Sequence, residues 1–268
     1  MKAMTKLIPI MCLFVIIGGS LFYSCSQEKK KETAIVLPLE AALSQAGENR
    51  VELEKVLHRY QSNPSDSLKY RAACFLIENM PSYTYYKGKL LEQYLTFFTL
   101  LQEARSKKVY PQAMIDSIRR MYGPFSLDSL QYCKDVVTVD SAYLCNNIDW
   151  AFKVWQEQPW GKNVSFADFC EYILPYRIGD ETLSYWREDI YRKYNPLLDS
   201  LRASTVLDIE DPLVAARCLC DSLRKRSRFF TTTVPQGLPH VGPEIAQSVS
   251  GSCRELSDYV VYVCRALG

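Results

Sequence analysis

The sequence has 268 residues, of which 48% are hydrophobic and 23% are charged, a composition that excludes a largely disordered chain. This length suffices for one large or two ordinary domains with a buried core. The 32 basic and 30 acidic residues nearly cancel, and only Lys29–Lys31 concentrates positive charge, so we expect no nucleic-acid partner. Only His58 and His240 are available for histidine chemistry.

The N-terminus has the pattern of an export signal. Lys2 and Lys6 precede an apolar stretch over residues 7–23, at the lower edge of what spans a bilayer. Residues 21–25 resemble a bacterial lipobox, in which the final cysteine is acylated. We therefore expect residues 1–25 to be a lipoprotein signal peptide, Cys25 to be the lipid attachment site, and the protein to be anchored to a membrane of the bacterial cell envelope. An uncleaved anchor and plain secretion are the alternatives.

The cysteines show no disulfide framework. Of ten, Cys12 would be removed with the signal and Cys25 would be acylated, which leaves the others at irregular spacings. Most of these lie within apolar helical patterns, where a cysteine acts as a small buried hydrophobe. Cys218 and Cys220 form a C-x-C without a second pair or a nearby histidine, so we expect no metal site and no cofactor.

Helical periodicity dominates the first half of the chain. Residues 49–80 predict two helices separated by a turn at Asn63-Pro64, residues 90–104 predict a third, and Pro111 begins a shorter one. We expect no strand in this part of the sequence.

Residues 139–186 are rich in aromatic side chains. Ser165 is expected to begin a helix that Pro175 stops, and a helix over residues 184–201 should be kinked or split at Asn195-Pro196. The aromatic residues fit either a buried core or an exposed platform for a sugar or a peptide. The core is the commoner use of large aromatic side chains.

The last part of the chain changes pattern. Pro212 is placed to begin a helix, residues 228–234 form the best strand candidate in the sequence, and a loop rich in proline and glycine follows over residues 235–243.

Cys253 stands at the start of a further helix. Ser252 and Glu255 form an S-x-x-E capping box that makes Cys253 the first helical residue. The positive end of the helix dipole and Arg254 should favour the thiolate, which is the form that attacks carbonyl groups. The helix should bury one face, formed by Leu256, Val260, Val263 and Leu267.

Gly251-Ser252-Cys253, the helix behind it and the ending Cys264-Arg265-Ala266-Leu267-Gly268 resemble the nucleophile segment of the transglutaminase-like superfamily. Residues 155–186 also resemble the helical region ahead of the core in exported bacterial members. The resemblance implies an α+β, papain-like core and a cysteine nucleophile at Cys253. It also implies an activity on amide bonds of protein or peptide substrates, by hydrolysis or acyl transfer.

The sequence departs from that family where the other catalytic residues belong. The family places its histidine and aspartate after the cysteine helix, whereas neither residue type follows Val260 here. We therefore expect a chain cut short after the nucleophile helix, inactive as it stands, with that helix loosely held. His240 is a weak substitute base, and Gln247 has the spacing of an oxyanion-hole glutamine.

These observations predict a mainly α protein, with a helical domain over residues 26–205 followed by the incomplete start of a transglutaminase-like core over residues 206–268. The alternative function is a non-catalytic envelope lipoprotein that binds glycan or peptide through the aromatic-rich helical domain. The DNA sequence after codon 268 would separate the two.

Overall fold

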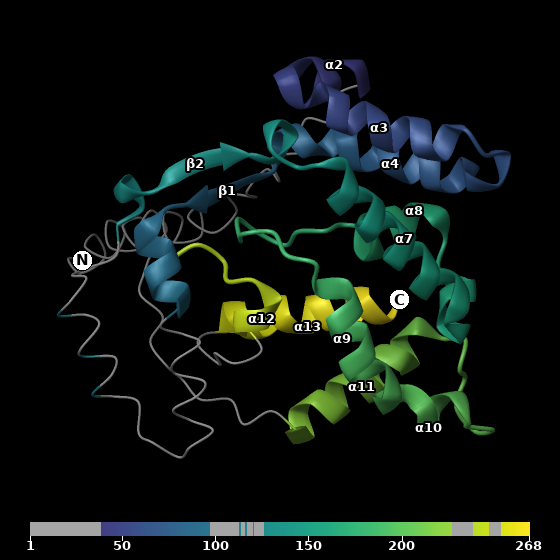
Figure 1. Ribbon diagram of the computed structural model, residues 1–268. Helices are drawn as coiled ribbons and strands as arrows, with labels where there is room; N and C mark the ends of the chain where they lie inside the picture. The colour runs from purple at the N-terminus through teal and green to yellow at the C-terminus, as the bar shows by residue number, and fades with distance from the viewer. Residues whose placement is uncertain are drawn as a thin grey trace, which may run out of the picture. The chain divides into compact units, whose positions relative to one another are not determined.

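The computed structural model describes residues 39–96, 126–226, 238–246 and 253–268, together with the single residues 113, 116 and 120. The described residues are mostly helical, which confirms the expectation of a mainly α protein (Figure 1). Contacts gather Val36–Gly268 into one compact unit. Within the described ranges, no helix has both the length and the apolar character needed to cross a bilayer.

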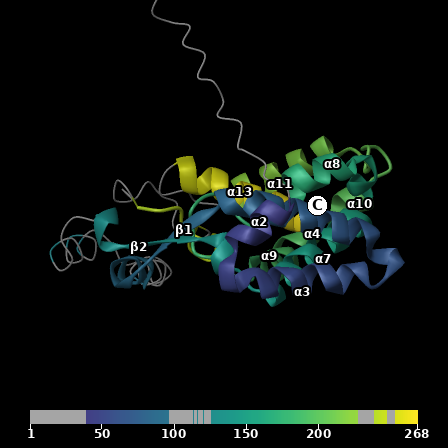
Figure 2. The ribbon, with the colours of Figure 1, turned by 90° about the horizontal axis from the view of Figure 1, so that it is seen from above.

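Three helices open the described chain. They are α2 (Leu39–Gln45), α3 (Arg50–Gln61) and α4 (Ser67–Asn79). Helices α3 and α4 lie side by side, as Figures 1 and 2 both show. The turn between them begins at Asn63, whose side-chain oxygen accepts a hydrogen bond from the backbone N–H of Ser65 at 3.1 Å. The predicted pair of helices with a turn at Asn63-Pro64 is therefore confirmed.

A two-stranded antiparallel sheet follows. Strand β1 (Thr84–Lys87) pairs with β2 (Gln131–Lys134), with Thr84 opposite Lys134. The expectation of no strand in the first half of the chain was wrong. Threonine and tyrosine favour extended backbone, but a strand of four residues carries too little alternation to be recognised without its distant partner.

The middle of the chain forms the longest helix of the described residues, α7 (Ser141–Glu157), followed by α8 (Phe166–Asp168). The predicted cap at Ser165 is confirmed, since its hydroxyl oxygen accepts from the backbone N–H of Asp168 at 3.1 Å. The helix then widens into a π-helix over Phe169–Ile173, where Leu174 N–H reaches the carbonyl of Phe169.

Residues 89–96 are also helical, which confirms the first part of the helix predicted over residues 90–104; the rest of that helix lies outside the described residues. The later helices are α9 (Trp186–Tyr194), α10 (Asp199–Arg202), α11 (Pro212–Arg226), α12 (Pro243–Ala246) and α13 (Cys253–Leu267). A 3₁₀ turn at Asn195–Leu198 separates α9 from α10, as the Asn195-Pro196 pair predicted. Pro212 begins α11 as expected. The predicted strand at residues 228–234 and the helix predicted from Pro111 lie outside the described residues, apart from three isolated positions.

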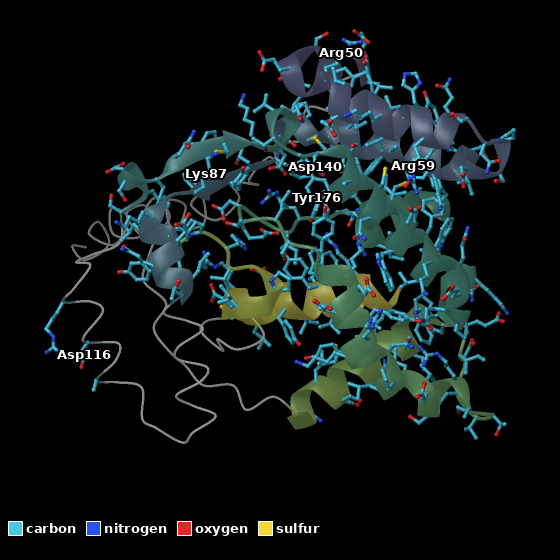
Figure 3. The ribbon with its side chains drawn as sticks, viewed as in Figure 1. Arg50, Arg59, Lys87, Asp116, Asp140 and Tyr176 are labelled. Atoms are coloured by element: carbon cyan, nitrogen blue, oxygen red, sulfur yellow. The ribbon has the colours of Figure 1, made fainter. Side chains whose placement is uncertain are left out.

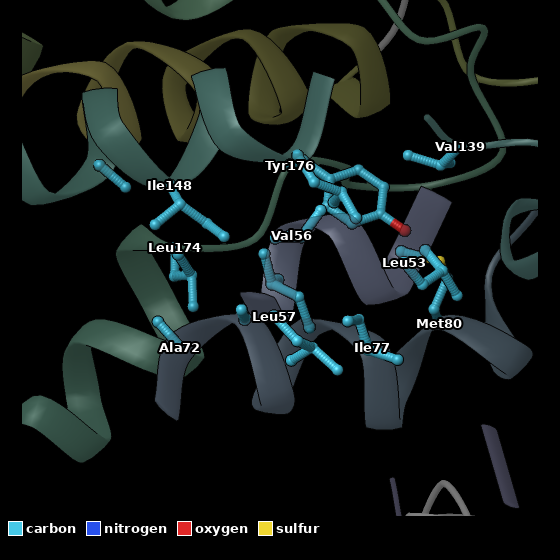
Figure 4. Close-up of a cluster of buried hydrophobic side chains, with 14 of the residues drawn as sticks. Leu53, Val56, Leu57, Ala72, Ile77, Met80, Val139, Ile148, Leu174 and Tyr176 are labelled. Carbon is cyan, nitrogen blue, oxygen red and sulfur yellow. The ribbon is translucent and has the colours of Figure 1, made fainter. Parts of the chain in front are cut away.

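Two hydrophobic clusters form the core. The first joins α2, α3, α4 and α7, and Figure 4 shows the Tyr176 ring among its aliphatic side chains. The second joins α9, α11 and α13. Most large aromatics of residues 139–186 are buried in these clusters, which confirms the core interpretation for Phe152, Trp160, Phe169, Tyr176 and Trp186. Tyr172 and Tyr185 are exceptions, with 66% and 54% of their surface exposed.

Helix α13 is packed more firmly than the sequence suggested. It contacts α9 and α7, and its buried residues include Tyr259, Tyr262 and Val263. Leu256 and Val260, which were expected on the buried face, are only partly buried. The expectation of a loosely held helix was wrong, because helices from earlier in the chain supply the packing surface that the sequence seemed to lack. The domain boundary expected at residue 206 stays a prediction.

Candidate functional site

Cys253 is the first residue of α13 and is exposed, as the sequence predicted. Its carbonyl accepts a hydrogen bond from the Ser257 hydroxyl at 2.8 Å. Within the described residues, no side chain hydrogen-bonds to the Cys253 thiol. Cys25, Gln247 and Ser252 lie outside the described residues, so the lipid site, the oxyanion glutamine and the capping box stay predictions.

His240 pairs with Asp258, a residue that the sequence did not single out. The imidazole Nδ1 lies 2.7 Å from Asp258 Oδ2, and the backbone N–H of His240 donates to Asp180 Oδ1 at 2.7 Å. The hydrogen bond to Asp258 raises the pKa of His240, while partial burial opposes the shift. A side chain at Gly179 could not be accommodated, because a Cβ there would lie 2.4 Å from the imidazole.

The His240–Asp258 pair does not share a helix face with the thiol. Asp258 is five residues after Cys253, which places it about 140° around the axis and about 7.5 Å along it. The pair therefore fixes the loop before α13 to that helix and is not positioned by this geometry as a base for Cys253. His58, the other histidine, is exposed on α3.

Arg177 and Asp135 form a buried ion pair. The Arg177 guanidinium donates to both carboxylate oxygens of Asp135, at 2.7 and 2.8 Å, and both side chains are at most 1% exposed. The Tyr176 hydroxyl donates to the same carboxylate at 3.0 Å. Burial raises the pKa of Asp135, and the charge and hydrogen bonds of Arg177 oppose that rise. The ion pair joins the 3₁₀ turn that follows β2, Asp135–Val137, to the segment that follows the π-helix.

Glu181 connects this ion pair to α13. Its carboxylate accepts from the backbone N–H groups of Ile178 and Gly179, each at 2.8 Å, and from the Tyr262 hydroxyl. Burial of the Tyr262 hydroxyl, together with the Glu181 charge, raises the pKa of Tyr262 well above its usual range. Tyr262 is therefore a neutral donor that ties the middle of α13 to the loop before α9.

Arg187 holds the C-terminal half of α13. Its guanidinium donates to Asn147 Oδ1 at 2.6 Å and to backbone carbonyls at 2.7 to 3.2 Å, those of Arg265, Ile173, Leu174 and Pro175. These carbonyls include the ends of α13 and of the π-helix, where the helix dipole is negative. Burial, and then the neighbouring charge of Arg265, lower the pKa of Arg187.

Arg265 completes the attachment of α13. It donates from Nε to the carbonyl of Tyr172 at 3.1 Å and from Nη1 to that of Arg177 at 2.7 Å. Together, Arg187 and Arg265 donate to five of the six backbone carbonyls of residues 172–177, the segment around Pro175. The C-terminal part of α13 is therefore held by buried hydrogen bonds, while its first residue, Cys253, is exposed to solvent.

Two cavities formed by described residues lie away from Cys253. One of about 370 Å³ lies at the other end of α13, where its lining includes Leu213, Leu219, Cys264 and Leu267. Another, of about 210 Å³, lies between β1, the start of α7 and residues 182–185. Neither is lined by Cys253.

Comparison of the chain with protein-family models, with curated proteins and with solved structures finds no match. Function is therefore inferred from the geometry and from the sequence motifs.

Proposed function

We propose that Cys253 is the nucleophile of a transglutaminase-like cysteine enzyme that acts on amide bonds. The observation that carries this proposal is an exposed thiol at the first residue of a 15-residue helix whose remaining length is held by buried contacts. The Gly-Ser-Cys sequence and the Cys-Arg-Ala-Leu-Gly ending of that helix support the same assignment. The α+β, papain-like core that the family implies for residues 206–268 is part of this proposal.

The chemistry is an acyl transfer through the Cys253 sulfur. The thiolate attacks the amide carbonyl carbon, the C–S bond forms, and the C–N bond breaks as the leaving amine takes a proton. Water or a second amine then takes the acyl group, which gives hydrolysis or cross-linking. Within the described residues no histidine contacts the thiol, so the proton for the amine has no positioned donor. Such a donor typically contributes 10²- to 10⁴-fold to the rate.

This geometry predicts that the 268-residue chain accepts an activated ester, whose leaving group needs no proton, but not an amide. Incubation with p-nitrophenyl acetate, followed by peptide mass spectrometry, should find acetylation at Cys253 before Cys220. Cys220 is the matched control, since it is exposed but lies within α11 rather than at a helix start.

Cys253→Ala should remove the fast-acetylating site, and Cys220→Ala should leave it. The anilide counterpart of the ester should show no turnover above background. Acetylation of Cys220 at an equal or higher rate would contradict the proposal, as would anilide turnover that vanishes in Cys253→Ala, because a base would then have to act within this chain.

We also propose that the protein is held in the bacterial cell envelope through an acylated Cys25. A basic and apolar segment leads into this cysteine in the sequence. Growth with a clickable fatty acid should label the protein in the membrane fraction, and Cys25→Ala should lose the label. Equal labelling of the variant would end this part of the proposal.

A further inference from the structure

A small cleft unrelated to Cys253 combines aromatic rings with hydroxyl groups. We call it the tyrosine cleft and define it by its lining: Tyr85, Thr138, Val139, Asp140, Tyr143, Thr182, Leu183 and Tyr185. Its volume is about 210 Å³, smaller than a typical drug-sized pocket. Asp140 marks its position at the start of α7 in Figure 3.

The rings of the cleft are unusual for this part of the chain because one of them is exposed. Tyr185 is 54% exposed, whereas most large aromatics of residues 139–186 are core. Its ring packs edge-to-face on Tyr143, with centroids 5.3 Å apart. Tyr85 is supported from another side by the Arg177 guanidinium, 5.4 Å from its ring centroid. The exposed Tyr185 ring is therefore packed against the buried Tyr143 ring.

Most hydroxyl groups of the cleft form no hydrogen bond with other described residues. Among the described residues, no hydrogen bond is formed by the hydroxyls of Tyr85, Thr182 and Tyr185. The Tyr143 hydroxyl also has no such partner, although Tyr143 is only 8% exposed. Asp140 uses Oδ1 to accept from the backbone N–H of Tyr143 at 2.7 Å, which leaves its other carboxylate oxygen available.

A second polar feature lies beside the cleft. Tyr143 and Tyr185 also line a space of about 10 Å³, together with Ser184. The Ser184 hydroxyl oxygen is buried, and it is the single buried side-chain polar atom of the described residues without a hydrogen-bond partner. Such groups are rare in native proteins, because each costs about 1–3 kcal/mol. The space has the size for one water or one ligand hydroxyl.

We propose that the tyrosine cleft binds one ring of a neutral saccharide. The C–H groups of a sugar ring suit an aromatic face, and its hydroxyls suit the carboxylate and hydroxyl groups of the lining. No lysine or arginine of the described residues lines the cleft itself. Arg177, behind Tyr85, is paired with Asp135, and Arg187, which lines the adjoining space, donates to Asn147 and to backbone carbonyls. A phosphate or other anion therefore has no free cation among the described residues of the cleft. An extended peptide is held mainly through main-chain hydrogen bonds along a strand edge, whereas this cleft offers side-chain groups. The proposal does not depend on the chemistry of Cys253.

Saturation-transfer NMR with the methyl glycosides of glucose, galactose, mannose and N-acetylglucosamine tests the proposal. At least one glycoside should receive saturation from the full chain, and Tyr185→Ala should weaken its affinity about 10-fold or more by removing the exposed ring. Tyr172→Ala is the matched control, because Tyr172 is equally prominent on the surface but does not line the cleft. It should leave binding unchanged.

Asp140→Asn gives an independent check. Asparagine is as good a helix cap as aspartate, so α7 should be preserved while the carboxylate charge is lost. We expect the same glycoside to bind several-fold more weakly. The proposal is overturned if no glycoside gives a saturation-transfer signal that Tyr185→Ala weakens. It is also overturned if the peptide trialanine gives such a signal with the parent chain and loses it with Tyr185→Ala.

Discussion

Two polar clusters hold the segment before α9 and the helix α13, and they differ in their exposure to solvent. The Arg177–Asp135 pair is fully enclosed, with at most 1% of either side chain exposed. The His240–Asp258 pair is closer to the surface, with 27% of the histidine side chain exposed. A buried pair is costly to break because the remaining charge is left without water or a partner, whereas an exposed pair is worth little.

This difference separates two tasks along α13. The buried cluster, continued through Glu181 and Tyr262, fixes the helix to the body of the protein. The His240–Asp258 pair holds the loop that leads into the helix, and the pKa of its histidine is raised by the hydrogen bond to Asp258. Cys253 lies at the open end, so its support depends mainly on the first cluster.

The largest expected effect comes from breaking the buried pair. Arg177→Met leaves Asp135 without its cation, and we expect the free energy of unfolding to fall by about 3–5 kcal/mol. Urea denaturation followed by circular dichroism measures this. The double variant Arg177→Met with Asp135→Leu should recover a large part of the loss, because no uncompensated charge remains. If the free energy of unfolding of Arg177→Met lay within about 0.5 kcal/mol of the parent value, the pair would not have the stabilising role proposed for it.

Removing the hydroxyl that ties α13 to Glu181 should have an intermediate effect. Tyr262→Phe keeps the ring among its neighbours but takes a hydrogen bond from a buried carboxylate, and we expect a loss of about 1–3 kcal/mol by the same measurement. Tyr172→Phe, on an exposed ring, is the control and should change the free energy of unfolding by less than about 0.5 kcal/mol. Equal effects of the two substitutions would show that Tyr262 contributes through its ring alone.

The smallest effect is expected at His240, and it has a defined sign. Its pKa is raised in the folded protein, chiefly by the Asp258 carboxylate. Its contribution to stability is therefore fully present below its ordinary pKa near 6.5 and is lost as the pH rises through the higher folded value. Because the pair is partly exposed, we expect less than about 1 kcal/mol.

Urea denaturation from pH 5.5 to pH 8.5 checks this prediction, with His240→Gln as the control. Asp180 and Arg254 also face the imidazole, so the comparison is made between the parent and the variant at each pH. The parent should lose stability relative to His240→Gln as the pH rises. A difference that is constant with pH would show that the histidine does not titrate against Asp258.

The sequence could predict what depends on near neighbours. Helices α3 and α4, the break at Asn195-Pro196 and the start of α11 follow from periodicity, proline and capping residues, and the structure confirms them. The position of Cys253 as the first residue of α13 was also predicted from its surroundings.

The sequence could not predict what depends on distant partners. Strand β1 pairs with residues more than forty positions away, and Arg187 binds backbone carbonyls from two separate segments and the side-chain oxygen of Asn147. Arg187 lies in the charged stretch of α9, beside Glu188 and Asp189, and nothing in that stretch indicates that it is buried among distant oxygens. The same reason explains why the predicted face of α13 was only partly right: Val263 and Leu267 are buried as expected, but the buried Tyr262, which donates to the distant Glu181, was missed.

The central claim, that an anchored helix presents Cys253 as a nucleophile, is tested most directly by competitive alkylation of the native chain at neutral pH. Limiting isotope-coded iodoacetamide and peptide mapping compare Cys253 with the exposed Cys220 and with Cys145, whose pKa is raised by burial. We predict that Cys253 reacts several-fold faster than both, and that the difference disappears in urea. Equal or faster alkylation of Cys220 in the folded protein would contradict the claim.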